Sequence, residues 1–146
     1  MIVLDACAVI AVFNDEPAAV EVAGYVRDGA ALTTVGIGEV FDTQIRRFNR
    51  SRHRTAANLT ELGIHEPIVV DDDLGSRAGI LRAAYYRLWG GQLSLADCIV
   101  AAAAKSLGAP LATSDARLLD MSYKEGIQVR ALPNDTGGFS WKEPHD

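Results

Sequence analysis

Short apolar runs alternate with longer helical patterns along almost the whole chain, and this alternation is the strongest constraint on its fold. The run Ile2–Leu4 is apolar throughout, which is typical of a strand buried on both faces. Further short strands are expected at 30–33, 67–70, 110–113 and 127–132. Strands separated by helices favour a mostly parallel sheet covered on both faces. The prediction is therefore an α/β fold, a three-layer α/β/α sandwich.

The segments between the strands carry helix start and stop signals. Helices are expected at 17–28, 35–49, 54–62, from 71–73 to 88, at Leu95–Leu107 and at 116–121. Thr34 and Ser94 are candidate N-caps, while Gly63, Gly108 and the pair Gly90 and Gly91 follow expected helix ends. The helix Leu95–Leu107 is apolar on nearly every face, so it is expected to lie in the interior.

The length of 146 residues predicts one domain, which we assign to 1–132, followed by a polar C-terminal tail at 133–146. The tail is expected to be loose unless Phe139 and Trp141 dock it. Cys7 and Cys98 form no disulfide framework and no zinc-binding pattern, which favours a cytoplasmic protein. No secretory signal and no membrane span are expected.

The formal net charge of −5 argues against a domain that binds nucleic acid by general electrostatic attraction, because such domains are usually basic. The acids are, however, unevenly placed. Asp5 and Asp115 directly follow expected strands, whereas Asp97 and Glu39 lie in the first turns of expected helices. In open parallel sheets, ligands bind outside the carboxyl ends of the strands. All four acids are expected at that edge.

Each acid has a structural explanation when it is considered alone. Asp5 and Asp115 can cap the segments that follow them, and Ser94 with Asp97 has the spacing of a capping box. Glu39 can be a solvated helix residue. A group of converging carboxylates, however, needs retained protons or a divalent cation to offset its repulsion. Oxygen ligands without histidine or thiolate suit Mg²⁺ or Mn²⁺, and such ions provide a bound water for phosphodiester hydrolysis.

Four segments carry a resemblance to a known family: IVLDACAVI at 2–10, GEV at 38–40, LSLAD at 93–97 and GAPLATSD at 108–115. Their order and spacing resemble PIN-domain ribonucleases, specifically the VapC-type toxins of bacterial toxin–antitoxin systems. The resemblance implies that Asp5, Glu39, Asp97 and Asp115 are the catalytic, metal-binding acids, with Thr113 in support. It also implies an Mg²⁺- or Mn²⁺-dependent endoribonuclease, an RNA substrate, a homodimer and a cognate VapB-type antitoxin.

The sequence departs from the family at Cys7, where serine or threonine is usual. A thiol is a weaker hydrogen-bonding group than a hydroxyl, so orientation of a metal-bound water could suffer. The structural alternative is that Cys7 and Cys98 are small buried apolar residues.

An arginine cluster at 46–54 is the second candidate functional feature. On a regular helix, Arg46 and Arg50 lie within about 20° of the face that carries Glu39, so they are candidate substrate-binding residues that extend the acidic site toward phosphate. The alternative is a solvated helix end with favourable charge near the C-terminus.

Two other functions remain open at this level. One is a catalytically silent PIN-like module that binds RNA or protein. The other is a haloacid-dehalogenase-type phosphatase, which needs a second aspartate where this chain has Cys7. The sequence does not select the RNA, its cleavage site or the number of metal ions. Two bound divalent ions would offset four of the five net negative charges, which reconciles an acidic chain with work on nucleic acid.

Overall fold

Four short parallel strands form the central sheet in a computed structural model that describes residues 1–64, 66–89 and 92–145. The strands are β1 (Ile2–Leu4), β2 (Ala30–Ala31), β3 (Leu111–Thr113) and β4 (Val129–Ala131). They are arranged in the order β2-β1-β3-β4. Val3 is the register partner of both Ala31 and Leu111, so β1 lies inside the sheet with a neighbour on each side.

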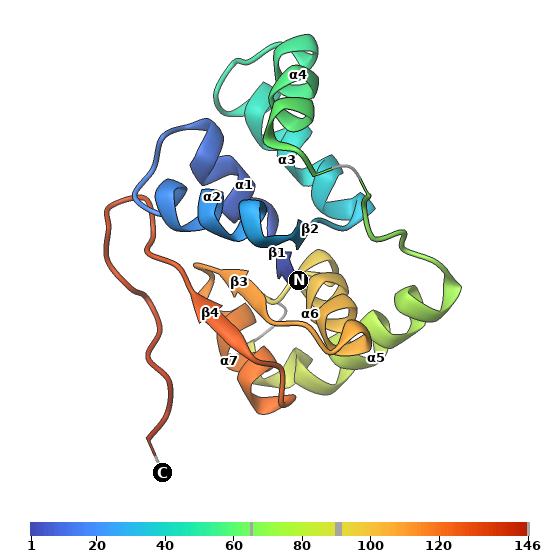
Figure 1. The fold of residues 1–146 in the computed structure, drawn as a ribbon. Coiled ribbons are helices and arrows are strands. Elements are labelled where there is room, and N and C mark those ends of the chain that lie inside the picture. Colours follow the sequence, from blue (N-terminus) through green and yellow to red (C-terminus); the bar gives the residue numbers. More distant parts are fainter. Residues whose placement is uncertain (65, 90–91, 146) are drawn as a thin grey trace.

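Seven helices within the described residues surround this sheet. They are α1 (Ala6–Phe13), α2 (Ala19–Asp28), α3 (Thr34–Arg46), α4 (Arg52–Leu62), α5 (Asp72–Trp89), α6 (Leu95–Leu107) and α7 (Ala116–Lys124). Figure 1 shows α1 and α2 on one side of the sheet and α5, α6 and α7 on the other, with α4 projecting away at the top. The predicted α/β/α sandwich is therefore confirmed.

The strand pleat explains why both faces need helices. Ile2 and Leu4 belong to the core beneath α1, α2 and α3, whereas Val3 points into the core formed with α5 and α6. Successive side chains of a strand point to opposite faces, so a strand that is apolar throughout has to be covered twice. The covering helix α6 is buried along its length from Cys98 to Ala104, as its apolar sequence predicted.

Several details of the sequence-based prediction were wrong. The N-cap of α3 is Thr33 rather than Thr34, since Thr33 Oγ1 accepts from the Gly36 amide at 2.9 Å. The segment Ala6–Phe13 is a helix that was not expected, and it begins with Asp5 as its N-cap. Residues 67–70 form no strand within the described residues. Their one β-type pairing is an isolated bridge between Ile68 and Thr33. Helix α3 ends at Arg46 rather than near 49, since the chain turns there and Asn49 adopts a φ of 53°. The expected stop at Gly90 and Gly91 lies outside the described residues.

The segment after β4 returns to the body of the protein through one of its two aromatic residues. Trp141 packs against Tyr123 at a ring-centroid distance of 5.9 Å, and its Nε1 approaches Asp120 Oδ1 at 3.5 Å. Phe139 is 61% exposed and does not dock the segment. Within the described residues, no helix is both long enough and apolar enough to span a membrane.

Candidate active site

The ends of β1 and β3 open into one cleft of about 450 Å³. The two strands are neighbours, and the amide of Asp5 donates to the carbonyl of Ala112 at 3.1 Å. The cleft is lined by all four predicted acids, which come from the end of β1, from α3, from α6 and from the segment after β3: Asp5, Glu39, Asp97 and Asp115. The parallel-sheet rule thus placed them at one edge.

Asp5 is the most deeply buried of the four acids. Its Oδ1 accepts from the Ala6 amide at 2.9 Å, which starts α1. Its Oδ2 accepts from Thr113 Oγ1 at 2.8 Å and from Cys7 Sγ at 3.4 Å. Burial nevertheless raises the pKa of Asp5 above its usual value, because the lost hydration outweighs these hydrogen bonds, and the nearby Asp115 adds to the rise.

Thr113 links the acids of the two strands. Its buried hydroxyl donates to Asp5 and accepts from the Asp115 amide at 3.1 Å. Asp115 in turn caps α7, since its Oδ1 accepts from the amides of Arg117 and Leu118 at 2.9 and 3.0 Å. Capping therefore holds Asp115 at the cleft, and the structural and functional explanations of this residue are compatible.

Asp97 and Ser94 form the predicted capping box at the start of α6. The Asp97 amide donates to Ser94 Oγ at 3.0 Å, and Asp97 Oδ2 accepts from the Ser94 amide at 3.1 Å. Burial and the negative charge of Asp5 raise the pKa of Asp97 to about 6, although its hydrogen bonds with Ser94 oppose the change. The cap thus fixes a carboxylate whose charge is poorly solvated.

Glu39 differs from the other acids because its carboxylate has a buried atom without a partner. Oε1 accepts no hydrogen bond from the described residues. The pKa of Glu39 is raised to about 7. Burial is the main cause, and repulsion from Asp5, Asp97 and Asp42 adds to it. An unpaired buried charge is costly, so this carboxylate is suited to retain a proton or to face a cation.

The donor set fits a hard divalent cation, although the side chains do not converge on one point. Among the described residues, no group of three or more His, Cys, Asp or Glu side chains is gathered closely enough to hold a metal ion. The cleft nevertheless supplies carboxylate oxygens alone, an unpaired oxygen on Glu39 and three acids with raised pKa values. Mg²⁺ and Mn²⁺ favour such oxygen ligands.

The two cysteines occupy different environments. Cys7 lines the cleft, and its Sγ lies 3.5 Å from Thr113 Oγ1 and accepts from Ser114 Oγ at 3.5 Å. Burial and the charge of Asp5 raise the pKa of Cys7 to about 12, so its sulfur is a protonated donor. Cys98 is enclosed in the core around α6. Both thiols are free. Cys98 fits the interpretation as a small buried apolar residue, whereas Cys7 does not, because its sulfur makes hydrogen bonds at the cleft.

The arginines show where sequence reasoning missed cleft residues. Arg46 bonds to Asp42 on the exposed face of α3, with Nη2 3.0 Å from Oδ2, and Arg50 follows the end of the helix. Among the described residues neither lines the cleft, whereas Arg47 and Phe48 do. The turn after Arg46 invalidates the angular count from Glu39 to Arg50.

The C-terminal segment also contributes to the cleft. Pro133, Asn134 and Asp135 line it, although the sequence placed them in a polar tail. Asn134 Oδ1 accepts from the amides of Thr136 and Gly138, which folds this segment into a turn. Only the position of β4 beside β3 brings it to the site, so no local signal predicted this contribution.

Comparison with known proteins identifies the family. The PIN domain family model matches residues 2–123. A FitAB complex bound to an IR36 DNA fragment is similar in fold, with a TM-score of 0.66, 17% identity and coverage of 99% of each chain. VapBC2 from Rickettsia felis bound to a promoter DNA fragment gives a TM-score of 0.65, 16% identity and coverage of 90% of this chain and 99% of that one.

A third similar structure is FitAcB from Neisseria gonorrhoeae, with a TM-score of 0.61, 18% identity and coverage of 88% of this chain and 96% of that one. No curated protein matches the sequence significantly. The chain belongs to the PIN domain family, as the four segments predicted. PIN domains are generally nucleases, which assigns the protein to the hydrolases that act on nucleic acid and removes the haloacid-dehalogenase alternative.

Proposed function

We propose that the protein is an Mg²⁺- or Mn²⁺-dependent endoribonuclease that acts as the toxin of a toxin–antitoxin pair. The observation that carries this proposal is the single cleft of a PIN domain lined by Asp5, Glu39, Asp97 and Asp115. The raised pKa values of three of these acids support a site that binds a cation in its working state.

The residues of the cleft have distinct roles in this proposal. Asp5 and Asp97 would be direct ligands, because hydrogen bonds already orient both carboxylates: both oxygens of Asp5 accept one, and Oδ2 of Asp97 accepts one from the Ser94 amide. When bound, a divalent ion supplies a water nucleophile and polarises the scissile phosphate. Glu39 has an unpaired oxygen available to orient that water or to accept its proton.

Supporting residues keep the ligands in place. The Thr113 hydroxyl holds Asp5 and the Asp115 amide together, and Ser94 fixes Asp97 through the capping box. The Cys7 thiol donates to the Asp5 oxygen that also accepts from Thr113. A serine or threonine would make a stronger hydrogen bond to Asp5 there. Cys7 is therefore expected to orient the Asp5 carboxylate less firmly without preventing it from binding the metal ion.

The partner proposal rests on the identities of the structural neighbours. FitAB and VapBC2 are two-component complexes, and both were solved with DNA. By this similarity we propose a VapB-type antitoxin as the cognate partner, together with a homodimeric toxin in the cytoplasm. The predicted RNA substrate follows from the VapC resemblance.

The direct test is cleavage of total bacterial RNA by the purified protein, with and without Mg²⁺ or Mn²⁺, followed by mapping of the new ends. We expect metal-dependent cleavage at defined positions and its loss in Asp97→Asn. The matched control is Asp72→Asn, which removes the same charge from an exposed residue at the start of α5.

Two outcomes would contradict the proposal. Full activity of Asp97→Asn would remove Asp97 from the site. Absence of both cleavage and Mn²⁺ binding in the wild-type protein would favour the catalytically silent module, because such a module has no need of the ion.

A further inference from the structure

The last turn of α3 places a cation and an aromatic ring at the acidic cleft. The helix ends at Arg46, and the next two residues, Arg47 and Phe48, line the same cleft as Glu39. Thr43, one turn before Arg47, lines it as well. The end of α3 is thus a wall of the site rather than a distant helix terminus.

Arg47 gives this wall a positive charge, whereas the other charged residues that line the cleft are negative. Those residues are all acids: Asp5, Glu16, Glu39, Asp97, Asp115 and Asp135. Among the residues that the structure describes, Arg47 is the one cation lining the cleft, and it makes no ion pair there. Arg46 beside it is already paired with Asp42. The Arg47 guanidinium is therefore available to a phosphate that approaches the acids.

Phe48 is exposed although it is apolar. Its side chain is 38% exposed, and the Arg47 guanidinium carbon lies 5.7 Å from the ring centroid. A cation over the ring orients the two side chains as a unit, and an exposed ring in a nucleic-acid cleft can stack with a base. Phe139, which is also exposed, lies on the C-terminal segment and does not line the cleft.

We propose that Arg47 and Phe48 hold one unpaired nucleotide beside the cleft acids, with Arg47 on the backbone phosphate and Phe48 stacked on the base. This inference rests on the proposed nuclease function and assigns two residues that position its RNA substrate at the cleft. Bases inside a duplex are covered by their neighbours on both faces, so a ring at the cleft reaches only an unstacked base.

The test measures binding separately from cleavage, in the full-length Asp97→Asn protein with Mg²⁺. Fluorescence anisotropy compares a single-stranded RNA oligonucleotide with the same strand in a duplex. A set of oligonucleotides with one abasic nucleotide at each successive position locates the stacked base. We expect tighter binding of the single strand and one or two adjacent positions at which removal of the base weakens binding about tenfold.

The decisive comparison pairs the abasic series with Phe48 variants. Phe48→Leu is expected to bind the intact single strand about tenfold more weakly and to lose the effect of the abasic position, whereas Phe48→Tyr retains both. Arg47→Gln is expected to reduce the slope of log affinity against log salt by about one. Phe139→Leu and Arg77→Gln are matched controls, expected to change neither measurement.

The inference is overturned if Phe48→Leu keeps the wild-type abasic pattern or if duplex RNA binds as tightly as the single strand. Both substituted side chains are exposed, so thermal unfolding should be unchanged and folding does not confound the result. Absence of cleavage and of Mn²⁺ binding in the wild-type protein would instead contradict the proposed function, while the binding comparison would still decide the role of Phe48.

Discussion

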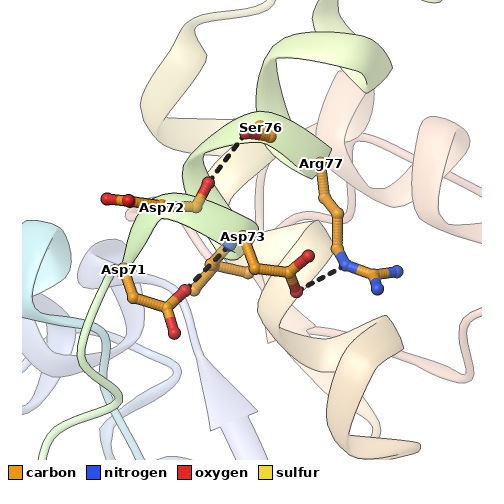
Figure 2. Close-up of polar contacts among 6 residues, drawn as sticks. Asp71, Asp72, Asp73, Ser76 and Arg77 are labelled. Atoms are coloured by element: carbon orange, nitrogen blue, oxygen red, sulfur yellow. Dashed lines mark hydrogen bonds and ion pairs between the residues drawn. The ribbon is translucent and has the colours of Figure 1, made fainter.

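Two acidic regions of this protein, the run Asp71–Asp73 and the cleft acids, behave differently, although most of their members lie at the starts of helices. Asp71, Asp72 and Asp73 are consecutive and begin α5, whereas the cleft acids are separated by long stretches of sequence. Figure 2 shows the first region, where Asp71 Oδ1 accepts from the Leu74 amide at 2.9 Å and Asp73 bonds to Arg77 at 2.8 Å. Asp72 extends outward while its carbonyl accepts from Ser76.

The difference lies in solvation and not in the number of acids. The three aspartates of α5 are exposed, so water screens their repulsion and a cap or an ion pair is sufficient. Asp5, Glu39 and Asp97 are withdrawn from water, which raises the pKa of each, and neighbouring acids add to the rise: Asp115 for Asp5, Asp5 and Asp97 for Glu39, and Asp5 for Asp97. A dense acidic run in the sequence is therefore poor evidence of a metal site, whereas dispersed acids brought into one cleft are good evidence.

The largest expected contrast is in metal binding. Saturating Mn²⁺, at about one hundred times its dissociation constant, should raise the Tm of the wild-type protein by about 5–10 °C. Asp5→Asn should lose most of this rise, because it removes a proposed ligand that is buried in the cleft. Asp72→Asn should keep it. Calorimetric titration and thermal unfolding measure the effect. An equal loss of the Mn²⁺-dependent rise in Tm in both variants would show that the cleft acids and the acids at the start of α5 do not differ in metal binding.

The next contrast is in pH dependence. The pKa values of about 6 for Asp97 and about 7 for Glu39 imply that protons compete with the metal below pH 7. Mn²⁺ affinity should therefore rise by about tenfold or more between pH 5.5 and 7.5, as measured by calorimetric titration. Asp73→Asn should show the same profile, and a flat wild-type profile would contradict the assigned pKa shifts.

The same groups fix the sign of the stability change in the metal-free protein. In the unfolded chain they ionise near pH 4, whereas the folded protein holds their protons to higher pH. The folded state thus binds more protons between pH 4 and 7, so these acids lower the free energy of unfolding as pH rises through that window. Chemical denaturation with and without Mn²⁺ should show this decrease only without the ion.

A smaller effect is expected from Glu39→Gln. Removing this partly buried charge relieves repulsion from Asp5 and Asp97 and should stabilise the metal-free protein by about 1 kcal/mol at pH 8, after allowance for solvent screening. The same substitution should weaken Mn²⁺ binding. Urea denaturation tests the first effect. Destabilisation would show that Glu39 has an ion-pair or packing role instead.

The smallest effect is expected from Asp73→Ala in the exposed region. It breaks one i,i+4 ion pair with Arg77 and should cost about 0.3–0.5 kcal/mol, an effect that high salt reduces. Urea denaturation at low and high salt measures it. A loss of more than about 1 kcal/mol would mean that the α5 acids are not simply solvated.

Much of the fold was predictable because its signals are local. The helix α6 was predicted at its observed bounds, since Ser94 and Gly108 mark its ends and its apolar faces require burial. Helix α1 was missed because its residues are apolar throughout, so the run lacks the polar positions that reveal helical periodicity. The segment 67–70 was assigned to a strand because local apolarity does not show whether a neighbouring strand is available.

The candidate site divides in the same way. Asp5, Asp97 and Asp115 were found because parallel strands end at a common edge and helices begin there. Arg47 and Phe48 were not singled out, since their place in the cleft depends on the turn that ends α3 at Arg46. Arg46 and Arg50 remain candidate phosphate contacts, although the structure places neither in the cleft lining among the described residues.

The sequence by itself determined the alternation of strands and helices and the caps that start α6 and α7. It also determined that Asp97 and Asp115 lie at the starts of these two helices. These features depend on side-chain polarity and backbone hydrogen bonding within a few residues. The tertiary structure decided which acids lose their water, which oxygen of Glu39 has no partner and which arginine faces the cleft. Burial and charge repulsion act between residues far apart in the chain, so only the packed fold sets them.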